Sequence, residues 1–508
     1  MSLLKYMKEE RSRKSGVLMP IFSLPSKYGI GDFGKESYNF IDLLKKSGQK
    51  VWQILPLVQT GYGNSPYSSV CADSFSPYYI SIELLLEQGL LTKEEIKFSL
   101  SDKERIDYGE LYAVRYPLLE KAFSRFDKNL PQFTKYISSK ESRDYALFMA
   151  IKEASGQKHF YEWEEGLKNR SPKSLRQFEK AYKDRVLFYQ FIQFIAKEQW
   201  LNLKTYANKK GIEILGDMPL YVALDSVDVW KDRHLFKLDQ NLKPTKVAGV
   251  PPDYFCEDGQ LWGNPVYNYQ EHQIDNFSWW TNRIKKALQV YDLVRIDHFR
   301  ALDRYYEIEA DSPNAKNGEW IKVPSEELFN AIHQKNDKSR IIAEDLGIID
   351  DGVRELIKSL GYPGMKILSF AFNGDKDNLY LPERIDENSI CYTGTHDNDT
   401  LMGLINSLNS WDYSNLYNGV KNSLCLMDID CQINDSLDLA NAIIMLGAKS
   451  KAKMFIVPMQ DILYLGSDYR INQPGVVKNS NWSVKFSKEQ ISIKSFANIK
   501  AITKKYNR

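Results

Sequence analysis

Apolar residues gather in eight short runs along the chain, and stretches with helical periodicity separate most of these runs. A short apolar run that is bounded by charge or by turn residues is typical of a buried strand. Eight buried strands that alternate with helices predict a closed parallel barrel, the α/β fold known as the (β/α)8 TIM barrel. The runs cover residues 16–22, 51–57, 212–217, 293–297, 341–347, 365–370, 390–393 and 454–461.

Two long segments interrupt this alternation, and we expect both to be insertions into a single barrel domain that spans residues 1–508. Residues 60–210 carry amphipathic stretches such as 186–206 and no convincing parallel strand, which predicts a mainly helical inserted subdomain. Residues 221–280 are loop-like and rich in aromatic side chains. Long loops inside compact domains are usually functional lids or disordered segments, and the aromatic content favours a lid.

The end of the chain carries one more helix signal. We expect a last helix to start at Ser487, because Gln490 completes a capping box there. Residues 497–508 are basic, and we expect them to fray.

One apolar run ends in charge, in the segment Leu293-Val294-Arg295-Ile296-Asp297-His298. Side chains alternate along a strand, so Arg295 and Asp297 share one face. An arginine that pairs with an aspartate favours the ionised carboxylate. A rigidly held ionised carboxylate is what a covalent nucleophile needs. A structural ion pair that caps the strand explains the same two residues equally well.

Acidic residues lie at or just past the ends of several predicted strands: Asp217, Asp297, Glu344 and Asp397. Barrel enzymes place their active sites at this carboxyl-terminal face. Paired carboxylates either bind a hard cation such as Mg²⁺ or divide acid and nucleophile work. Because Arg295 beside Asp297 would repel a cation, the second use is favoured, with one carboxyl ionised and one protonated as in glycosidic chemistry.

Composition excludes several classes of protein. Hydrophobic residues make up 43% and charged residues 26%, as is usual for a globular protein, and the net charge of +2 gives no nucleic-acid footprint. Five cysteines without CxxC spacing indicate free thiols in a reducing compartment, and six histidines without HExxH spacing argue against a zinc site. No signal-peptide pattern and no apolar run of membrane length is present, so we expect a cytoplasmic protein without membrane partners.

Three segments resemble the catalytic segments of 4-α-glucanotransferases of the amylomaltase (disproportionating enzyme) family, which is related to the α-amylases. They are residues 295–300, 343–347 and 395–399. The absence of a separate C-terminal β-domain after the eighth strand also resembles amylomaltases rather than α-amylases. Further similar segments follow in family order at residues 52–57, 65–67, 216–222, 249–255, 262–265 and 470–475.

The resemblance implies roles for the acids. Asp297 would be the nucleophile, Glu344 the general acid and then base, and Asp397 a ligand of the sugar-ring hydroxyls. No metal and no organic cofactor are expected, because side chains supply both the acid and the nucleophile. The substrate-binding residues would be Arg295, His396, Tyr67, Asp217, Asp345, Trp262 and Asn472.

The expected partners are α-1,4-glucans and maltooligosaccharides, and no pattern specifies an oligomeric state. The three acids do not distinguish transfer from hydrolysis, because water and a sugar hydroxyl can capture the same intermediate. Within the loop from Gly249 to Asn264, Tyr254, Phe255 and Trp262 are candidates for excluding water. An α-glucan hydrolase and a catalytically silent glucan-binding barrel are the alternatives. For His298, His333, His234 and Tyr267 we expect packing or surface roles.

Overall fold

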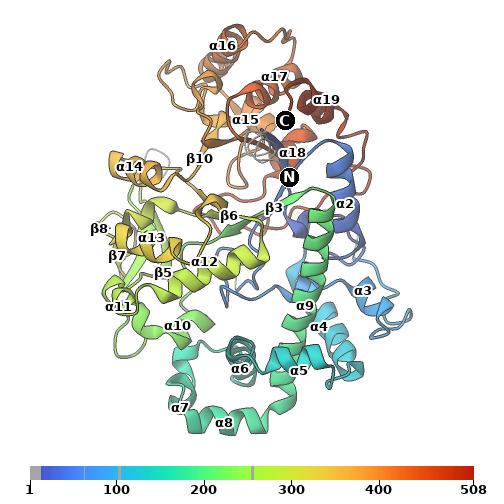
Figure 1. Cartoon of the computed structure of the whole chain (residues 1–508), viewed down its shortest axis with the longest axis vertical. Coiled ribbons are helices and arrows are strands. Elements are labelled where there is room, and N and C mark those ends of the chain that lie inside the picture. Colours follow the sequence, from blue (N-terminus) through green and yellow to red (C-terminus); the bar gives the residue numbers. More distant parts are fainter. Residues whose placement is uncertain (1–12, 62, 101–104, 253–256) are drawn as a thin grey trace, which may run out of the picture.

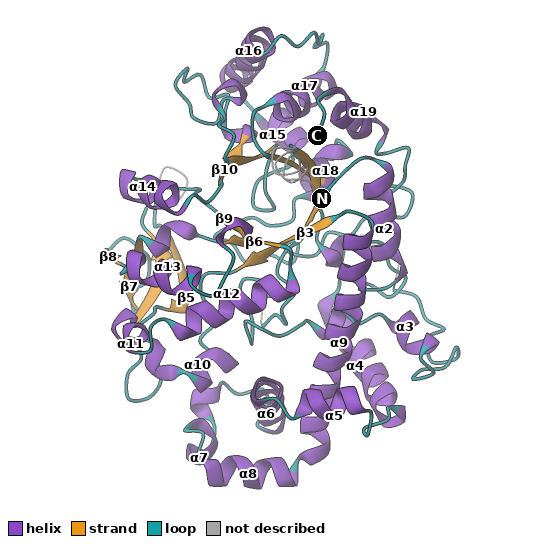
Figure 2. Ribbon diagram, viewed as in Figure 1, coloured by secondary structure: helices purple, strands orange, loops and turns teal. Residues whose placement is uncertain are grey.

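A sheet of eight parallel strands forms the centre of the molecule (Figures 1 and 2). The structure is a computed structural model that describes residues 13–61, 63–100, 105–252 and 257–508. The strand order is β10-β11-β12-β1-β2-β3-β6-β9. The bounds are β1(Lys14–Leu18), β2(Val51–Gln53), β3(Glu213–Met218), β6(Leu293–Ile296), β9(Ile341–Ala343), β10(Gly364–Ile367), β11(Ser389–Tyr392) and β12(Met454–Pro458).

The two end strands of this sheet come together and nearly close the barrel. The N–H of Ala343 on β9 donates to the carbonyl of Pro363, the residue before β10, at 3.0 Å. All eight predicted runs therefore form strands, and the barrel prediction is confirmed. The strands stop earlier than most of the runs, because the residues that follow them turn into the loops of the barrel rim.

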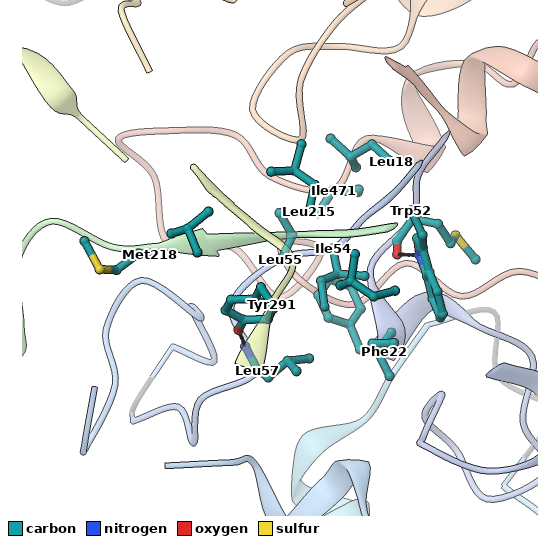
Figure 3. Packing of buried hydrophobic residues seen from close by; sticks show 14 of the residues in the cluster. Leu18, Phe22, Trp52, Ile54, Leu55, Leu57, Leu215, Met218, Tyr291 and Ile471 are labelled. Carbon is teal, nitrogen blue, oxygen red and sulfur yellow. Dashed lines mark hydrogen bonds between the residues drawn. The ribbon is translucent and has the colours of Figure 1, made fainter. Parts of the chain in front are cut away.

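Apolar side chains from neighbouring strands and from the segments after them fill the core (Figure 3). The buried Trp52 donates its indole N–H to the carbonyl of Met19 at 2.8 Å, which satisfies its one polar group. Tyr291 packs on Gly216 of β3, where an added Cβ would lie 2.1 Å from its ring. This close approach requires glycine directly before Asp217.

Helices surround the sheet. Those of residues 108–181 lie together at the bottom of Figure 1, and the helix of residues 183–209 rises from there to the barrel. The longest, α9(Lys183–Lys209), buries Phe188, Ile192 and Ile195 at helical spacing. This part of the chain lies in the range predicted to be a helical insertion. Its helices before α9 are α4(Tyr108–Arg125), α5(Pro131–Ile137), α6(Lys140–Ala154), α7(Glu165–Lys168) and α8(Pro172–Ala181), while α2(Lys35–Lys46) and α3(Ile82–Glu87) precede them.

A second, antiparallel sheet lies beside the barrel with the order β5-β4-β7-β8. Its strands are β4(Lys246–Val250), β5(Gln260–Pro265), β7(Arg304–Glu309) and β8(Gly318–Lys322). Much of the segment expected to be loop is thus strand or helix, with α10(Val227–Lys231), α11(Tyr269–Ile274) and the start of α12(Ser278–Val290). The pattern of apolar positions did not predict β5, because this strand is largely exposed. Its pairing with β4 holds it in place instead.

The remaining helices follow the later strands. They are α13(Ser325–His333), α14(Asp351–Leu360), α15(Leu401–Ser407), α16(Ser410–Leu426), α17(Ser436–Lys449), α18(Met459–Ile462) and α19(Ala497–Lys505). In the part of the chain that the structure describes, no helix is both long and apolar enough to span a membrane.

The expected helix start at Ser487 is wrong. Both capping-box hydrogen bonds between Ser487 and Gln490 form, at 2.8 and 3.3 Å, but turns follow and α19 begins only at Ala497. The end of the chain does not fray either. Ile499 and Ile502 are buried, and the guanidinium of Arg508 donates to the carbonyls of residues 448, 450 and 452.

Candidate active site

Arg295 and the predicted acidic site residues lie at or after the carboxyl ends of barrel strands. Asp217 lies in β3, Arg295 in β6, Asp297 directly after β6, and Glu344 directly after β9. Asp397 follows β11 by a few residues. Because neighbouring parallel strands end at the same face, residues far apart in sequence meet there.

Arg295 is the buried centre of the charge network. Its Nε and Nη2 donate to the two carboxylate oxygens of Asp217 at 2.9 and 2.6 Å, and Nη2 donates to Asp297 Oδ1 at 3.1 Å. Asp217 and Arg295 are register partners on β3 and β6, which places them side by side. The sequence indicated the contact with Asp297, but the bidentate partner is Asp217.

Tyr67 closes this network from the loop after β2. Its hydroxyl donates to Asp217 Oδ2 at 2.5 Å. Its ring stacks on the imidazole of His396 with centroids 5.2 Å apart and planes 9° apart. Both oxygens of Asp217 are therefore engaged by protein groups, so Asp217 positions Arg295 and Tyr67.

The backbone after Asp297 holds Glu344. His298 has a left-handed conformation with φ 47°, and its backbone N–H donates to Glu344 Oε2. The N–H of Phe299 donates to the carbonyl of Glu344 at 3.1 Å, and the N–H of Glu344 donates to the carbonyl of Ile296 at 3.1 Å. The two candidate catalytic carboxyls are thus fixed to one turn.

Burial shifts the pKa of both carboxyls upward. Burial raises the pKa of Glu344 to about 7, although Arg295 and the His298 N–H oppose the shift. Burial and the neighbouring Glu344 also raise the pKa of Asp297, against the effect of Arg295. That Arg295 keeps Asp297 ionised stays a prediction: the guanidinium lowers the pKa of this carboxyl, and burial raises it.

Asp397 is held by residues of two loops. Asn472 Nδ2 donates to Asp397 Oδ1 at 2.6 Å, and His396 Nε2 lies 3.3 Å from the same oxygen. Arg470 Nη2 donates to the backbone carbonyl of Asp397 at 2.7 Å. Burial lowers the pKa of His396, so the ring is neutral near pH 7. The side chain of Asp397 is 43% exposed, so it can reach a bound sugar.

Asp345 and Trp262 flank the carboxyls on two sides. Asp345 turns toward β10, where its Oδ1 accepts the N–H of Met365 at 2.6 Å. Trp262 lies on β5 and is 37% exposed, and its ring meets the ring of His298 edge-on at 4.8 Å. Tyr254 and Phe255 lie outside the described residues.

The structure adds three residues that sequence reasoning did not assign to the site. His298 holds Glu344 through its backbone, Arg470 holds the Asp397 loop, and burial beside Asp345 and Glu344 raises the pKa of Tyr380 to about 12. The sequence offered a signal for Arg470, because this residue begins segment 470–475, which resembles the family. No local pattern marks the left-handed turn of His298.

Tyr267, His272 and Trp280 pack together, as expected for Tyr267.

No described group of three or more His, Cys, Asp or Glu side chains is arranged to hold a metal ion. The acids that a cation would need, Asp217 and Asp297, both accept hydrogen bonds from Arg295. The arrangement instead offers two buried carboxyls with raised pKa values, of which Asp297 lies beside the Arg295 guanidinium and Glu344 accepts a backbone N–H. Two carboxyls in different surroundings can divide the work of nucleophile and proton donor.

Comparisons with known proteins agree with this chemistry. Residues 19–491 match the family described as 4-alpha-glucanotransferase, glycoside hydrolase family 77. The chain is 41% identical over 498 residues to the 4-alpha-glucanotransferase of Clostridium butyricum, covering 96% of this chain and 100% of the relative. It is 42% identical over 479 residues to that of Aquifex aeolicus, covering 93% and 96%.

Solved structures give the same result. The amylomaltase from Streptococcus agalactiae, solved in complex with acarbose, matches with a TM-score of 0.92 and 38% identity over 98% of this chain and 99% of that chain. The amylomaltase from Corynebacterium glutamicum shares the fold, with a TM-score of 0.79 at 19% identity over 99% of this chain and 76% of that chain. The resemblance carried by the three segments is thus confirmed, and the chain belongs to the 4-alpha-glucanotransferase (amylomaltase) family of enzymes.

Proposed function

We propose that this 4-alpha-glucanotransferase is a retaining enzyme. It moves a segment of α-1,4-glucan from a donor maltooligosaccharide to the 4-hydroxyl of an acceptor glucan or glucose, through a covalent glucosyl-enzyme on Asp297. The observation that carries the proposal is the turn at residues 297–298, which bears Asp297 and donates a backbone N–H to Glu344. This contact and the effect of Glu344 on the pKa of Asp297 support neighbouring carboxyls, and neighbouring carboxyls favour a nucleophile over a base that works through an intervening water.

In the first step Asp297 attacks the anomeric carbon while the bond to the leaving sugar breaks. Glu344 gives its proton to the leaving oxygen, and its raised pKa of about 7 supports this role because the acid is protonated near neutral pH. Arg295 at 3.1 Å favours the reactive form in which Asp297 is the ionised member of the pair.

In the second step the acceptor replaces the leaving sugar. Glu344, now ionised, takes the proton of the acceptor 4-hydroxyl, and the oxygen attacks the anomeric carbon and displaces Asp297. Two inversions retain the α-linkage. The N–H of His298 supports this step because a backbone donor stabilises the carboxylate form of Glu344.

Asp397 and its neighbours bind the sugar at the cleaved bond in this proposal. Asn472 and His396 fix the orientation of Asp397 Oδ1, so its other oxygen is free to accept from a ring hydroxyl. The Tyr67 ring is held by its stack on His396 and by its hydroxyl on Asp217, so it presents a rigid surface to the sugar.

A reducing compartment such as the cytoplasm is part of the proposal. All the cysteines within the described residues are free, and Cys425 is exposed. Exposed free thiols persist where the surroundings are reducing.

Incubation with pure maltotriose tests the activity. We expect a ladder of shorter and longer oligomers with free glucose, while the total number of reducing ends stays constant. Rising reducing ends with shorter products alone would instead identify a hydrolase.

The Asp297→Asn variant separates catalysis from binding. We expect maltooligosaccharides to bind while transfer vanishes, because an amide cannot form the glycosyl ester. Unchanged transfer in this variant would remove Asp297 from the mechanism, and a wild-type protein that binds glucan without turnover would be a silent binding barrel.

A further inference from the structure

The eighth apolar run of the sequence also ends in an acid, Asp461, which the proposed mechanism does not use. Asp461 lies in α18, the short helix that follows β12, and it is 3% exposed. A carboxylate in such a place costs free energy unless hydrogen bonds satisfy its oxygens. The partners of Asp461 therefore indicate what this residue does.

The partners of Asp461 are the two ends of the Asp397 loop, residues 394–400. Asp461 Oδ2 accepts the hydroxyl of Thr393 at 2.5 Å, and Oδ1 accepts the backbone N–H of Leu401 at 2.7 Å. Thr393 directly follows β11, and Leu401 is the first residue of α15, which Figure 1 shows beside α18. The loop thus leaves and returns at one side chain, with Asp397 midway between the two contacts.

Both ends of the loop are also fixed to the barrel. The carbonyl of Thr393 accepts the N–H of Ser369 at 3.0 Å. At the other end Thr400 caps α15, because its hydroxyl accepts the N–H of Gly403 at 2.9 Å. Asp461 connects these two anchored ends, so it sets the separation between them.

Other hydrogen bonds hold the middle of the loop. Asn398 Oδ1 accepts the backbone N–H and the hydroxyl of Thr395, at 2.8 and 2.9 Å. The Asp399 carboxylate accepts the hydroxyl of Ser467 at 2.8 Å. The shape of the loop is therefore set locally, whereas its position relative to the barrel depends on its ends.

Asp461 acts on the loop and not on the sugar. Both of its oxygens are occupied by protein donors, and almost none of its surface reaches the substrate side. Burial raises the pKa of Asp461 to about 6, so the side chain is a carboxylate at pH 7 and both oxygens can accept. The residue is thus a buried acceptor for two loop ends.

We propose that Asp461 is a positioning residue for glucosyl transfer, which binds both ends of the Asp397 loop and thereby holds Asp397 against the sugar at the cleaved bond. The inference rests on the role of Asp397 proposed above. No bond of the reaction is made or broken at Asp461. Its effect is geometric, because a sugar-binding carboxylate stabilises the transition state only from the correct position.

Two substitutions of Asp461 and one of its neighbour test the proposal. Asp461→Ala removes both contacts. Asp461→Asn keeps both, because its oxygen accepts from Leu401 and its amide donates to the hydroxyl of Thr393, which can accept as well as donate. Ile462→Ala is the matched control: this neighbour on α18 is 5% exposed, so its truncation destabilises the helix, and it makes no hydrogen bond to the loop.

The measurement is the kcat of maltotriose disproportionation, at a temperature where thermal melts show each variant to be folded. We expect Asp461→Ala to lower kcat on the order of 10- to 100-fold, the cost of a small misplacement of a group that binds the transition state. Asp461→Asn is expected to recover most of this loss. Ile462→Ala is expected to keep the wild-type kcat, although its melting temperature falls. Equal kcat values for Asp461→Ala and Ile462→Ala, or for Asp461→Ala and Asp461→Asn, would overturn the proposal.

A double-mutant cycle shows whether Asp461 acts through Asp397. In the Asp397→Asn background we expect Asp461→Ala to lower kcat/KM far less than it does in the wild type, because the group that it positions is already impaired. Fully additive losses would place the effect of Asp461 elsewhere and overturn the proposal.

The wild-type rate keeps the two proposals apart. If the wild type transferred no glucosyl units from maltotriose, the proposed function would fail, and the role of Asp461 in transfer would fail with it. If the wild type transferred them and Asp461→Ala matched the Ile462→Ala control, only the role of Asp461 would be lost.

Discussion

At the scale of single residues, neighbouring groups hold the proposed catalytic carboxyls in place. Arg295 is bound bidentately by Asp217, and Glu344 is bound by the backbone N–H of His298. Each positioning contact joins two strands or loops. The site is therefore rigid before substrate arrives, which lowers the entropic cost of reaching the transition state.

Glu344→Gln removes the proton donor and the buried ionisable group together. Loss of general acid catalysis is expected to lower kcat on the order of 10²–10⁴-fold. In the wild type, transfer is expected to fall as pH rises through about 7, because Glu344 then loses the proton it must donate. A kcat profile that stays flat between pH 6 and 8.5 would contradict the assignment.

The same substitution makes a stability prediction. The pKa of Glu344 rises from an ordinary 4.5 to about 7 on folding, so its contribution to stability is present below pH 4.5 and is lost as pH rises toward 7. Gln does not ionise. We expect Glu344→Gln to raise the melting temperature at pH 8 and to change it little at pH 4; a decrease at pH 8 would refute the buried-carboxyl account.

Substitutions of His298 test whether its backbone N–H or its imidazole ring holds Glu344 in position. Its φ of 47° suits glycine and strains a β-branched residue by roughly 1–3 kcal/mol. We expect His298→Gly to keep the N–H on Glu344 and with it the position of the acidic limb in the pH–kcat profile, whereas His298→Val moves that limb and lowers kcat. Equal effects of both variants would assign the role to the imidazole ring.

At the scale of secondary-structure elements, β5 of the small antiparallel sheet carries Trp262 against the ring of His298, which follows the proposed nucleophile Asp297. The adjacent Leu261 is 40% exposed, and its side chain alternates to the other face of the strand. This pair of neighbours makes the strand suitable for a matched experiment on water exclusion.

Trp262→Ala is expected to raise the ratio of hydrolysis to transfer, because a smaller side chain leaves water better access to the glucosyl-enzyme. Leu261→Ala is expected to leave the ratio unchanged. The measurement is the release of reducing ends per transfer event from maltotriose. If the two variants behave alike, Trp262 has no part in excluding water.

At the scale of the whole molecule, the last residue ties the barrel's outer layer together. The Arg508 guanidinium donates to carbonyls of Ala448 at the end of α17, of Ser450 and of Ala452 before β12, at 2.5, 2.7 and 2.9 Å. Burial lowers its pKa to about 9. The guanidinium stays charged near neutral pH because this lowered pKa still lies above 7, and Arg13 Nη1 donates to the same Ser450 carbonyl at 2.8 Å.

Arg508→Ala is expected to destabilise the protein by about 1–3 kcal/mol, the cost of removing the guanidinium that donates to the carbonyls of Ala448 and Ala452. Lys504→Ala, on the exposed face of α19, is the control. Urea denaturation measures both, and transfer from maltotriose should be unaffected at 25 °C. A loss in Arg508→Ala no larger than in Lys504→Ala would show that the clamp contributes nothing.

The sequence by itself determined the eight strands, because a buried strand leaves a continuous apolar run. It also determined the acids at the ends of these strands and the family, because the family's chemistry needs particular residue types at those positions. Only the tertiary structure decided what depends on pairing between distant segments. The exposed strand β5 has no apolar pattern, and the capping box at Ser487 forms without a helix.

The same holds within the site. The sequence placed Arg295 beside Asp297, but the neighbouring strand supplies its stronger partner, Asp217. The contact of the His298 N–H with Glu344 likewise joins residues many positions apart in the sequence. The free energy of such contacts comes from burial and hydrogen bonds that exist only after the chain has folded, so no local window of residues contains them.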